Sequence, residues 1–161
     1  MRRQPLLVSF NGISFDFALM RALLREEAKQ LQADAGYVTE EALALTHLCD
    51  QFKCLCAQSY DILVEIWKAY PQDKKVRGLN SLDAIAQANG LEAKKMDGAT
   101  APHLWAQGRH AEVIMYNLAD VIKTRHLFSM ICDERPILRG DGKPITLPLP
   151  SEAQCALLNS L

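Results

Sequence analysis

Apolar and polar positions near the start of the chain predict a strand, a tight turn and a helix. Residues 6–10 form a mostly apolar run that is long enough for one buried strand. Asn11-Gly12 is a strong turn signal that ends the run, and Ser14 is a suitable N-cap for the helix that follows. This arrangement places Asp16 in the first helical turn, beside the carboxyl end of the strand.

Helical spacing of apolar residues continues through most of the remaining chain. We expect helices at 14–33, ended by Gly36, at 39–58, capped by Thr39, at 82–89, capped by Ser81, in a short segment from Pro102 to Gly108, and at 109–132. Residues 60–67 fit either a short strand or the start of a helix. The last helix carries apolar residues over a broad surface.

The C-terminal stretch changes character, because Pro and Gly interrupt its apolar residues. Segments 137–138 and 145–147 predict an extended segment or a small hairpin, and Ser151 is placed to cap a short helix to Leu161. We therefore predict two parts: a domain over 1–132 and a tail over 133–161.

Composition limits the class of protein. The chain has 161 residues, 49% hydrophobic content and a net charge of −1, which suits one domain and gives no electrostatic support for a polybasic partner surface. No apolar run approaches the roughly 18 residues of a membrane helix. The five cysteines form no CxxC pair, which favours reduced core thiols. We expect a soluble, cytoplasmic protein without a membrane partner.

Two local signals remain open when they are taken from the residues alone. Asp16 is either a ligand at the end of a strand or only a favourable anion near a positive helix end, and spacing alone favours the second. The basic residues over 74–77 are either solvated surface or a phosphate contact. Tyr116 and Asp120 are four residues apart, so their side chains share one face of the predicted helix.

Read together, these segments resemble a family of nucleases. Residues 10–16 resemble the second acidic motif of the DEDD-type 3′–5′ exonucleases of the ribonuclease H-like superfamily, and 116–121 resemble the tyrosine-containing form of the third motif. Between them, residues 60–63, 81–86, 90–91, Lys94, 97–98, Trp105 and Gly108 follow in the order found in the bacterial branch related to the exonuclease domain of family B DNA polymerases.

The resemblance implies hydrolysis of phosphodiesters from a nucleic-acid 3′ end, such as single-stranded DNA, with two Mg²⁺ or Mn²⁺ ions about 4 Å apart. By this resemblance Asp120 ligates the ion that carries the attacking water, Tyr116 orients that water, and Asp16 supports the metal site from the opposite wall of one cleft. Asn11, Phe15 and Lys94 contact the nucleic acid. Hard divalent ions prefer oxygen ligands, which suits Asp and excludes the cysteines.

The chain departs from this family in its first motif, an Asp-x-Glu on the first strand. Only residues 1–10 precede Asn11 here, and none is acidic. The resemblance therefore predicts a truncated α/β ribonuclease H-like fold, mostly helical, without its first three strands. We expect the isolated chain to be an impaired or inactive exonuclease or, alternatively, a nucleic-acid-binding or protein-interaction module. We also expect a second copy, a strand-donating partner or the tail over 137–147 to cover the strand's open edge.

Overall fold

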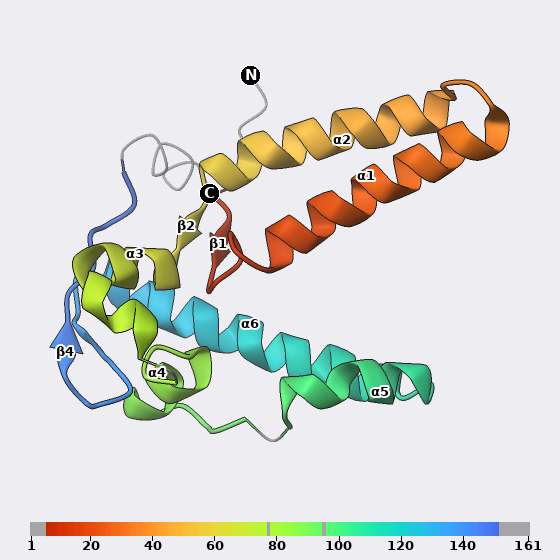
Figure 1. Cartoon of the computed structure of the whole chain (residues 1–161). Coiled ribbons are helices and arrows are strands. Elements are labelled where there is room, and N and C mark those ends of the chain that lie inside the picture. The colour runs from red at the N-terminus through yellow and green to blue at the C-terminus, as the bar shows by residue number, and fades with distance from the viewer. Residues whose placement is uncertain (1–5, 77, 95, 152–161) are drawn as a thin grey trace. The chain divides into compact units, whose positions relative to one another are not determined.

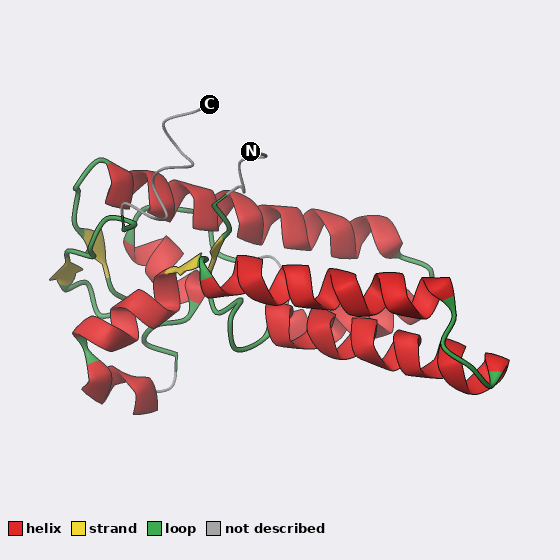
Figure 2. Ribbon diagram, turned by 90° about the horizontal axis from the view of Figure 1, so that it is seen from above, coloured by secondary structure: helices red, strands yellow, loops and turns green. Residues whose placement is uncertain are grey.

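The computed structural model describes residues 6–76, 78–94 and 96–151, and most of them lie in helices (Figures 1 and 2). In chain order the elements are β1 (Val8–Ser9), α1 (Asp16–Ala35), α2 (Glu40–Ala57), β2 (Tyr60–Asp61), α3 (Ile62–Ala69), the 3₁₀ helix η1 (Pro71–Lys75), α4 (Leu82–Ala88), the 3₁₀ helix η2 (Gly98–Thr100), α5 (Ala101–Ala106), α6 (His110–Cys132), β3 (Ile137–Leu138) and β4 (Pro144–Ile145).

These elements form two compact units with one small sheet in each. The first unit comprises Met1–Ile62 and Pro150–Leu161, and the second comprises Leu63–Leu149. In the first unit β1 runs parallel to β2, and in the second β3 runs antiparallel to β4. The architecture is thus mostly helical with small sheets, which is compatible with the α/β class that the sequence predicts.

The first unit contains a hairpin of two long helices, α1 and α2, which lie side by side (Figure 1). α1 ends at Gly36, which has a left-handed φ of 74° and donates its N–H to the carbonyl of Gln32. Thr39 caps α2, because its Oγ1 accepts the N–H of Ala42 at 3.1 Å. Both predicted helix signals at this turn are therefore confirmed.

The entry to α1 differs from the predicted one. β1 is shorter than the expected strand at 6–10, and Ser14 is not the N-cap, because the helix begins at Asp16. Phe15 stands at the N-cap position without a side-chain capping hydrogen bond. The carbonyls of Asn11 and Gly12 instead accept the N–H groups of Phe15 and Phe17. Backbone hydrogen bonds of the turn, and not a side-chain cap from Ser14, therefore begin this helix.

The second unit packs α4 and α6 against the C-terminal hairpin. Its buried apolar side chains include Ile66, Ile85, Leu127, Ile131, Ile137 and Ile145. The side-chain amide of Asn89 donates to the carbonyl of Leu138 at 2.7 Å and accepts the N–H of Leu138 at 2.9 Å, which fixes β3 beside the end of α4. The predicted hairpin is confirmed, and it joins the same unit as α6.

The strands of the tail pair with one another. Segment 137–147 supplies both strands of its own sheet, whereas β1 pairs with β2. That the tail covers the edge of β1 stays a prediction, because the two segments belong to separate units. The proposed end helix at 152–161 and Cys155 lie outside the described residues.

Other expectations are refined by the structure. Residues 60–67 contain both of the expected alternatives, since β2 leads directly into α3. The apolar surface of α6 is only partly buried: Val113 lies inside, whereas Ile114 and Val121 are 58% and 62% exposed.

Cys54 and Cys132 are exposed, so the prediction of core thiols is wrong for these two. Within the described segments, no helix is long and apolar enough to cross a membrane.

Candidate functional site

In the first unit, the carboxylate of Asp61 holds the turn at the carboxyl end of β1. Its Oδ1 accepts the N–H of Asn11 at 2.9 Å, and its Oδ2 accepts the N–H of Ile13 at 2.9 Å. The hydroxyl of Ser9 donates to the same Oδ2 at 3.1 Å. Asp61 is 1% exposed, so these donors compensate a buried charge. This carboxylate is therefore a structural part of the turn.

Gly12 is required in this turn because the backbone passes close to its neighbours. A Cβ atom at this position would lie 2.6 Å from the Cβ of Ser9 and 3.0 Å from the Cζ of Phe17. Asn11 beside it has a φ of 66°, in the left-handed region that asparagine tolerates better than most residues. The Asn-Gly pair therefore encodes both the turn and its tight packing.

Asp16, Asn11 and Phe15, three of the predicted site residues, gather around this turn. Asp16 is exposed and lies in the first turn of α1. Neighbouring chain atoms partly shield its carboxyl from water, which raises the pKa above the ordinary value, and the nearby carboxylate of Asp61 raises it further. Phe15 is 61% exposed. Their predicted roles toward metal and nucleic acid stay predictions.

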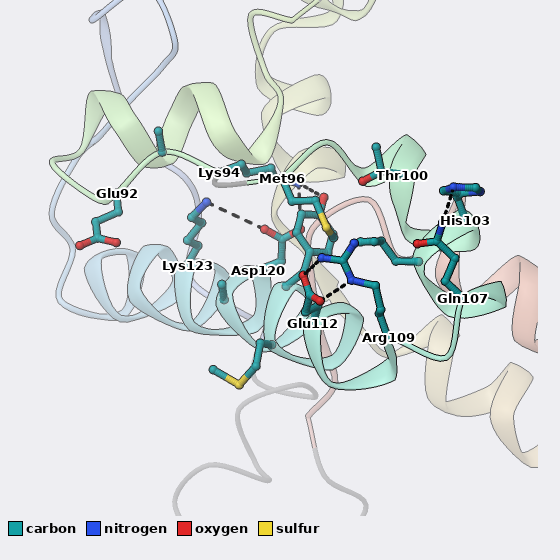
Figure 3. Close-up of a pocket in the computed structure, with 15 residues that line it drawn as sticks. Glu92, Lys94, Met96, Thr100, His103, Gln107, Arg109, Glu112, Asp120 and Lys123 are labelled. Carbon is teal, nitrogen blue, oxygen red and sulfur yellow. Dashed lines mark hydrogen bonds and ion pairs between the residues drawn. The ribbon is translucent and has the colours of Figure 1, made fainter.

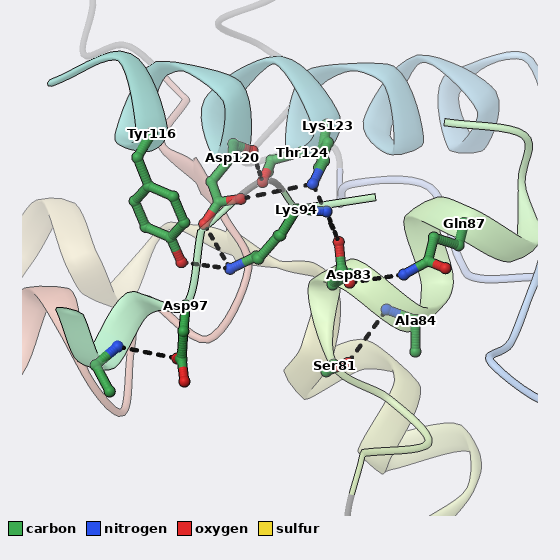
Figure 4. Close-up of polar contacts among 11 residues, drawn as sticks. Ser81, Asp83, Ala84, Gln87, Lys94, Asp97, Tyr116, Asp120, Lys123 and Thr124 are labelled. Atoms are coloured by element: carbon green, nitrogen blue, oxygen red, sulfur yellow. Dashed lines mark hydrogen bonds and ion pairs between the residues drawn. The ribbon is translucent and has the colours of Figure 1, made fainter. Parts of the chain in front are cut away.

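In the second unit, Lys94 joins the two predicted catalytic side chains of α6 (Figure 4). The Nζ of Lys94 donates to the hydroxyl of Tyr116 at 2.8 Å and to the Oδ2 of Asp120 at 2.8 Å. The same ammonium lies 4.9 Å from the centre of the tyrosine ring. The prediction that Tyr116 and Asp120 share a helix face is confirmed, and Lys94 lies between them.

Two further residues, which the sequence prediction missed, extend this cluster. Lys123, whose side chain is 9% exposed, places its Nζ 3.2 Å from the Oδ1 of Asp83 and 4.0 Å from the Oδ1 of Asp120. The backbone N–H of Lys94 donates to the same Oδ1 of Asp83 at 2.7 Å. The sequence could have indicated Lys123, because this residue follows Asp120 by three positions and therefore lies on the same face of the helix.

The pKa values in the cluster reflect this pairing. Burial tends to lower the pKa of the Lys94 ammonium, but its hydrogen bonds to Asp120 and Tyr116 outweigh burial and raise the pKa above the ordinary value. Burial likewise tends to raise the pKa of Asp83. The N–H of Lys94 and the ammonium of Lys123 reverse this effect and lower it. The cluster therefore favours the charged forms of Lys94 and Asp83.

The surroundings of Asp120 do not fit the Mg²⁺ or Mn²⁺ pair that the resemblance implies. Its Oδ2 is bound by the Lys94 ammonium, and its Oδ1 is buried, with no hydrogen-bond partner among the described residues. Both nearby cations, Lys94 and Lys123, repel a divalent ion. Within the part of the chain that the structure describes, no group of three or more His, Cys, Asp or Glu side chains is placed to hold a metal ion.

The strand–turn–helix of the first unit and the Tyr–Asp face of α6 in the second carry the motifs on which the resemblance to 3′–5′ exonucleases rests. Residues 1–135 match a family described as a predicted 3′–5′ exonuclease related to the exonuclease domain of PolB. Since this match covers most of the chain, the protein belongs to that family. Searches of curated proteins and of solved structures found no match.

Proposed function

We propose that this chain is an exonuclease-like domain that binds the 3′ end of a single-stranded nucleic acid and does not hydrolyse it on its own. Membership of the exonuclease family supports the choice of ligand. The contacts of Asp120 support the loss of hydrolysis. The tyrosine-containing DEDD type, which the motifs suggest, is part of the same proposal.

The observation that carries the proposal is the position of the Lys94 ammonium. It lies 2.8 Å from both the Asp120 carboxylate and the Tyr116 hydroxyl, the two groups that the resemblance assigns to a metal ion and to the attacking water. An ammonium group carries a single positive charge. Unlike a divalent metal ion, it does not ligate a water nucleophile or act together with a second ion. The charge of Asp120 is therefore neutralised by a group that does not activate water for hydrolysis.

The same neutralisation favours binding of a phosphodiester. A bare pair of carboxylates repels a phosphate, but Asp120 and Asp83 are each compensated by a lysine. Binding of nucleic acid at this cluster then needs no divalent ion. We expect the affinity for an oligonucleotide to be about equal in EDTA and in Mg²⁺, apart from the ordinary screening effect of salt.

Fluorescence anisotropy with a 5′-labelled single-stranded oligodeoxynucleotide tests binding directly. We expect Lys94→Met to weaken binding roughly tenfold, because it leaves the Asp120 carboxylate uncompensated and this charge then repels the phosphodiester. Lys68→Met is the matched control, since Lys68 belongs to the same unit and its exposed side chain also pairs with a carboxylate, that of Glu65. As an unlabelled competitor, a circular oligonucleotide of the same sequence should bind more weakly than the linear one. Equal affinity for both forms, or no binding, contradicts recognition of a 3′ end.

A second candidate function is association with another chain through the edge of β1. In the described part of the chain β1 has only β2 as a strand neighbour, and the two strands form a sheet of their own. An open strand edge favours pairing with a second copy or with a strand-donating partner. Light scattering across a range of protein concentrations tests the homodimer, and a monomer at every concentration removes it.

A further inference from the structure

α6 has a second apolar face, on the side of the helix that points away from its buried residues. The members of this face share helical spacing, and each is between 47% and 63% exposed: Ile114, Met115, Leu118, Val121 and Ile122. A helix that is apolar on all sides is normally covered on all sides. A contiguous exposed apolar face of this kind is typical of an interaction surface.

The face is large enough for an interface between two proteins. Five side chains of this size, each about half exposed, present roughly 500 Å² of apolar surface, as much as the largest patch on a typical monomer. Two such faces together bury roughly 1,000 Å², which is the lower limit for a specific interface. None of the five side chains is charged, so the face matches another apolar face of equal size.

The apolar positions of this face are symmetric about Leu118. Two of them precede Leu118 by four and three residues, and the other two follow it by three and four. Isoleucine stands at both ends, as Ile114 and Ile122. An interface around a two-fold axis requires a surface that is complementary to itself, in which each contact occurs twice. An antiparallel copy of α6 satisfies this requirement, because it places isoleucine against isoleucine and methionine against valine.

We propose that α6 packs antiparallel against α6 of a second copy of this chain, with Leu118 at the two-fold axis. Arg125 favours this direction over the parallel one. A parallel pair brings the two Arg125 guanidinium groups together, whereas in the antiparallel pair each of them lies opposite the small side chain of Ala111. This interface is separate from the edge of β1, and it does not depend on binding of a nucleic acid.

The proposed interface leaves the Lys94 cluster on another side of α6. Figure 3 shows Asp120 and Lys123 pointing from α6 toward the segment that carries Lys94. Asp120 follows Leu118 by two positions, which is more than half a turn around the helix. Met115 lies at the border, since it also lines the hollow between α5 and α6. Each copy in the pair therefore keeps its own cluster accessible.

Sedimentation equilibrium without nucleic acid tests the association. The wild type should show a monomer–dimer equilibrium that depends on concentration. Leu118→Glu should raise the dissociation constant roughly tenfold or more, because it places two carboxylates side by side at the axis. Leu23→Glu, at an exposed position of α1, is the matched control and should leave the constant unchanged. Glutamate suits an exposed helical position, and circular dichroism checks that both variants stay folded.

Two results of this experiment overturn the proposal. One is a wild type that stays monomeric at every concentration, which would mean that the face is free or binds a different protein. The other is a dimer that Leu118→Glu leaves intact, which would place the contact elsewhere, for example at the edge of β1. Leu118→Glu should bind the oligonucleotide as the wild type does, so that failure of the 3′-end function is read separately.

An introduced charge pair tests the antiparallel direction. Ile114→Glu and Ile122→Lys should each weaken association, because each places an unpaired charge in the apolar face. Both substitutions in one chain should restore association, because the introduced carboxylate of each copy then faces the introduced ammonium of the other. In a parallel pair the like charges would meet instead. A double variant that associates no better than the two single variants overturns the antiparallel arrangement.

Discussion

The acidic side chains of the two units have different kinds of partner: backbone N–H groups and a hydroxyl in the first unit, lysine ammonium groups in the second. In the first, the carboxylate of Asp61 binds backbone N–H groups and a hydroxyl, and its charge helps to raise the pKa of Asp16. In the second, Asp120 and Asp83 are paired with the ammonium groups of Lys94 and Lys123. Asp61 thus stabilises a turn and places a negative charge near Asp16. Asp120 and Asp83, in contrast, are neutralised by lysines of the same unit.

This difference shows why a family motif is not by itself a metal site. A divalent ion is attracted where carboxylates repel one another and repelled where cations already surround them. Asp120 has the residue type and the helix position that the resemblance assigns to a metal ligand, but the ammonium groups beside it supply the positive charge that a metal ion would supply.

The largest effect on stability is expected from Asp61. Asp61→Ala leaves two backbone N–H groups and the hydroxyl of Ser9 without their acceptor, which should cost about 3–5 kcal/mol of unfolding free energy. Asp61→Asn keeps one acceptor oxygen and should cost clearly less. Urea unfolding followed by circular dichroism measures both. Equal, small losses for the two variants would show that Asp61 does not hold the turn.

Lys123 should give the next largest effect. Lys123→Met buries a similar volume but leaves Asp83 without its ammonium partner. Because the Asp83 side chain is 28% exposed, water screens part of this loss. We expect a cost of about 1–3 kcal/mol in the same unfolding experiment. Lys29→Met, at a pair whose two side chains are both exposed, should cost less than about 0.5 kcal/mol, and a similar cost for Lys29 and Lys123 contradicts the account.

A smaller effect is expected from the contact between Lys94 and Asp120. Both side chains are 26% exposed. A double-mutant cycle with Lys94→Met and Asp120→Asn should give a coupling energy of about 0.5–1.5 kcal/mol in favour of the pair. The cycle isolates this contact from the separate effects of each substitution. Additive losses, with a coupling near zero, would show that the ammonium does not compensate Asp120.

The smallest effects concern pH, and they have opposite signs in the two units. The raised pKa of Asp16 contributes stability below the unfolded value of 3.8, which is lost as the pH rises through its folded pKa. The lowered pKa of Asp83 contributes stability above 3.8, which is lost as the pH falls through its folded pKa. NMR titration of both carboxyl groups should place Asp16 above 3.8 and Asp83 below it. The reverse order contradicts the comparison.

Much of the fold follows from local signals in the sequence. Thr39, Ser81 and Gly36 mark helix ends that the structure confirms, because caps and left-handed glycines act within a few residues. The prediction that Ser14 caps α1 was wrong, because the turn before this helix is held by Asp61, about fifty residues away. The contact between the tail hairpin and α6 was also missed, because periodicity does not indicate which elements meet.

The candidate site was predictable only in part. The four-residue spacing placed Tyr116 and Asp120 on one face, and the motif order drew attention to Lys94. That Lys94 binds both of them depends on a contact across 22 to 26 residues, which no local pattern encodes. The prediction that Asp16 and Asp120 face one cleft stays a prediction, since the two residues belong to separate units.

The most direct test of the central claim is a nuclease assay on 5′-labelled single-stranded DNA in Mn²⁺, comparing the wild type with Asp120→Ala. The account predicts that the wild type shortens the DNA no faster than the variant, although it binds the same oligonucleotide. Shortening from the 3′ end that requires Mn²⁺ and disappears in Asp120→Ala would contradict it, because Asp120 would then serve a metal despite its lysine partners.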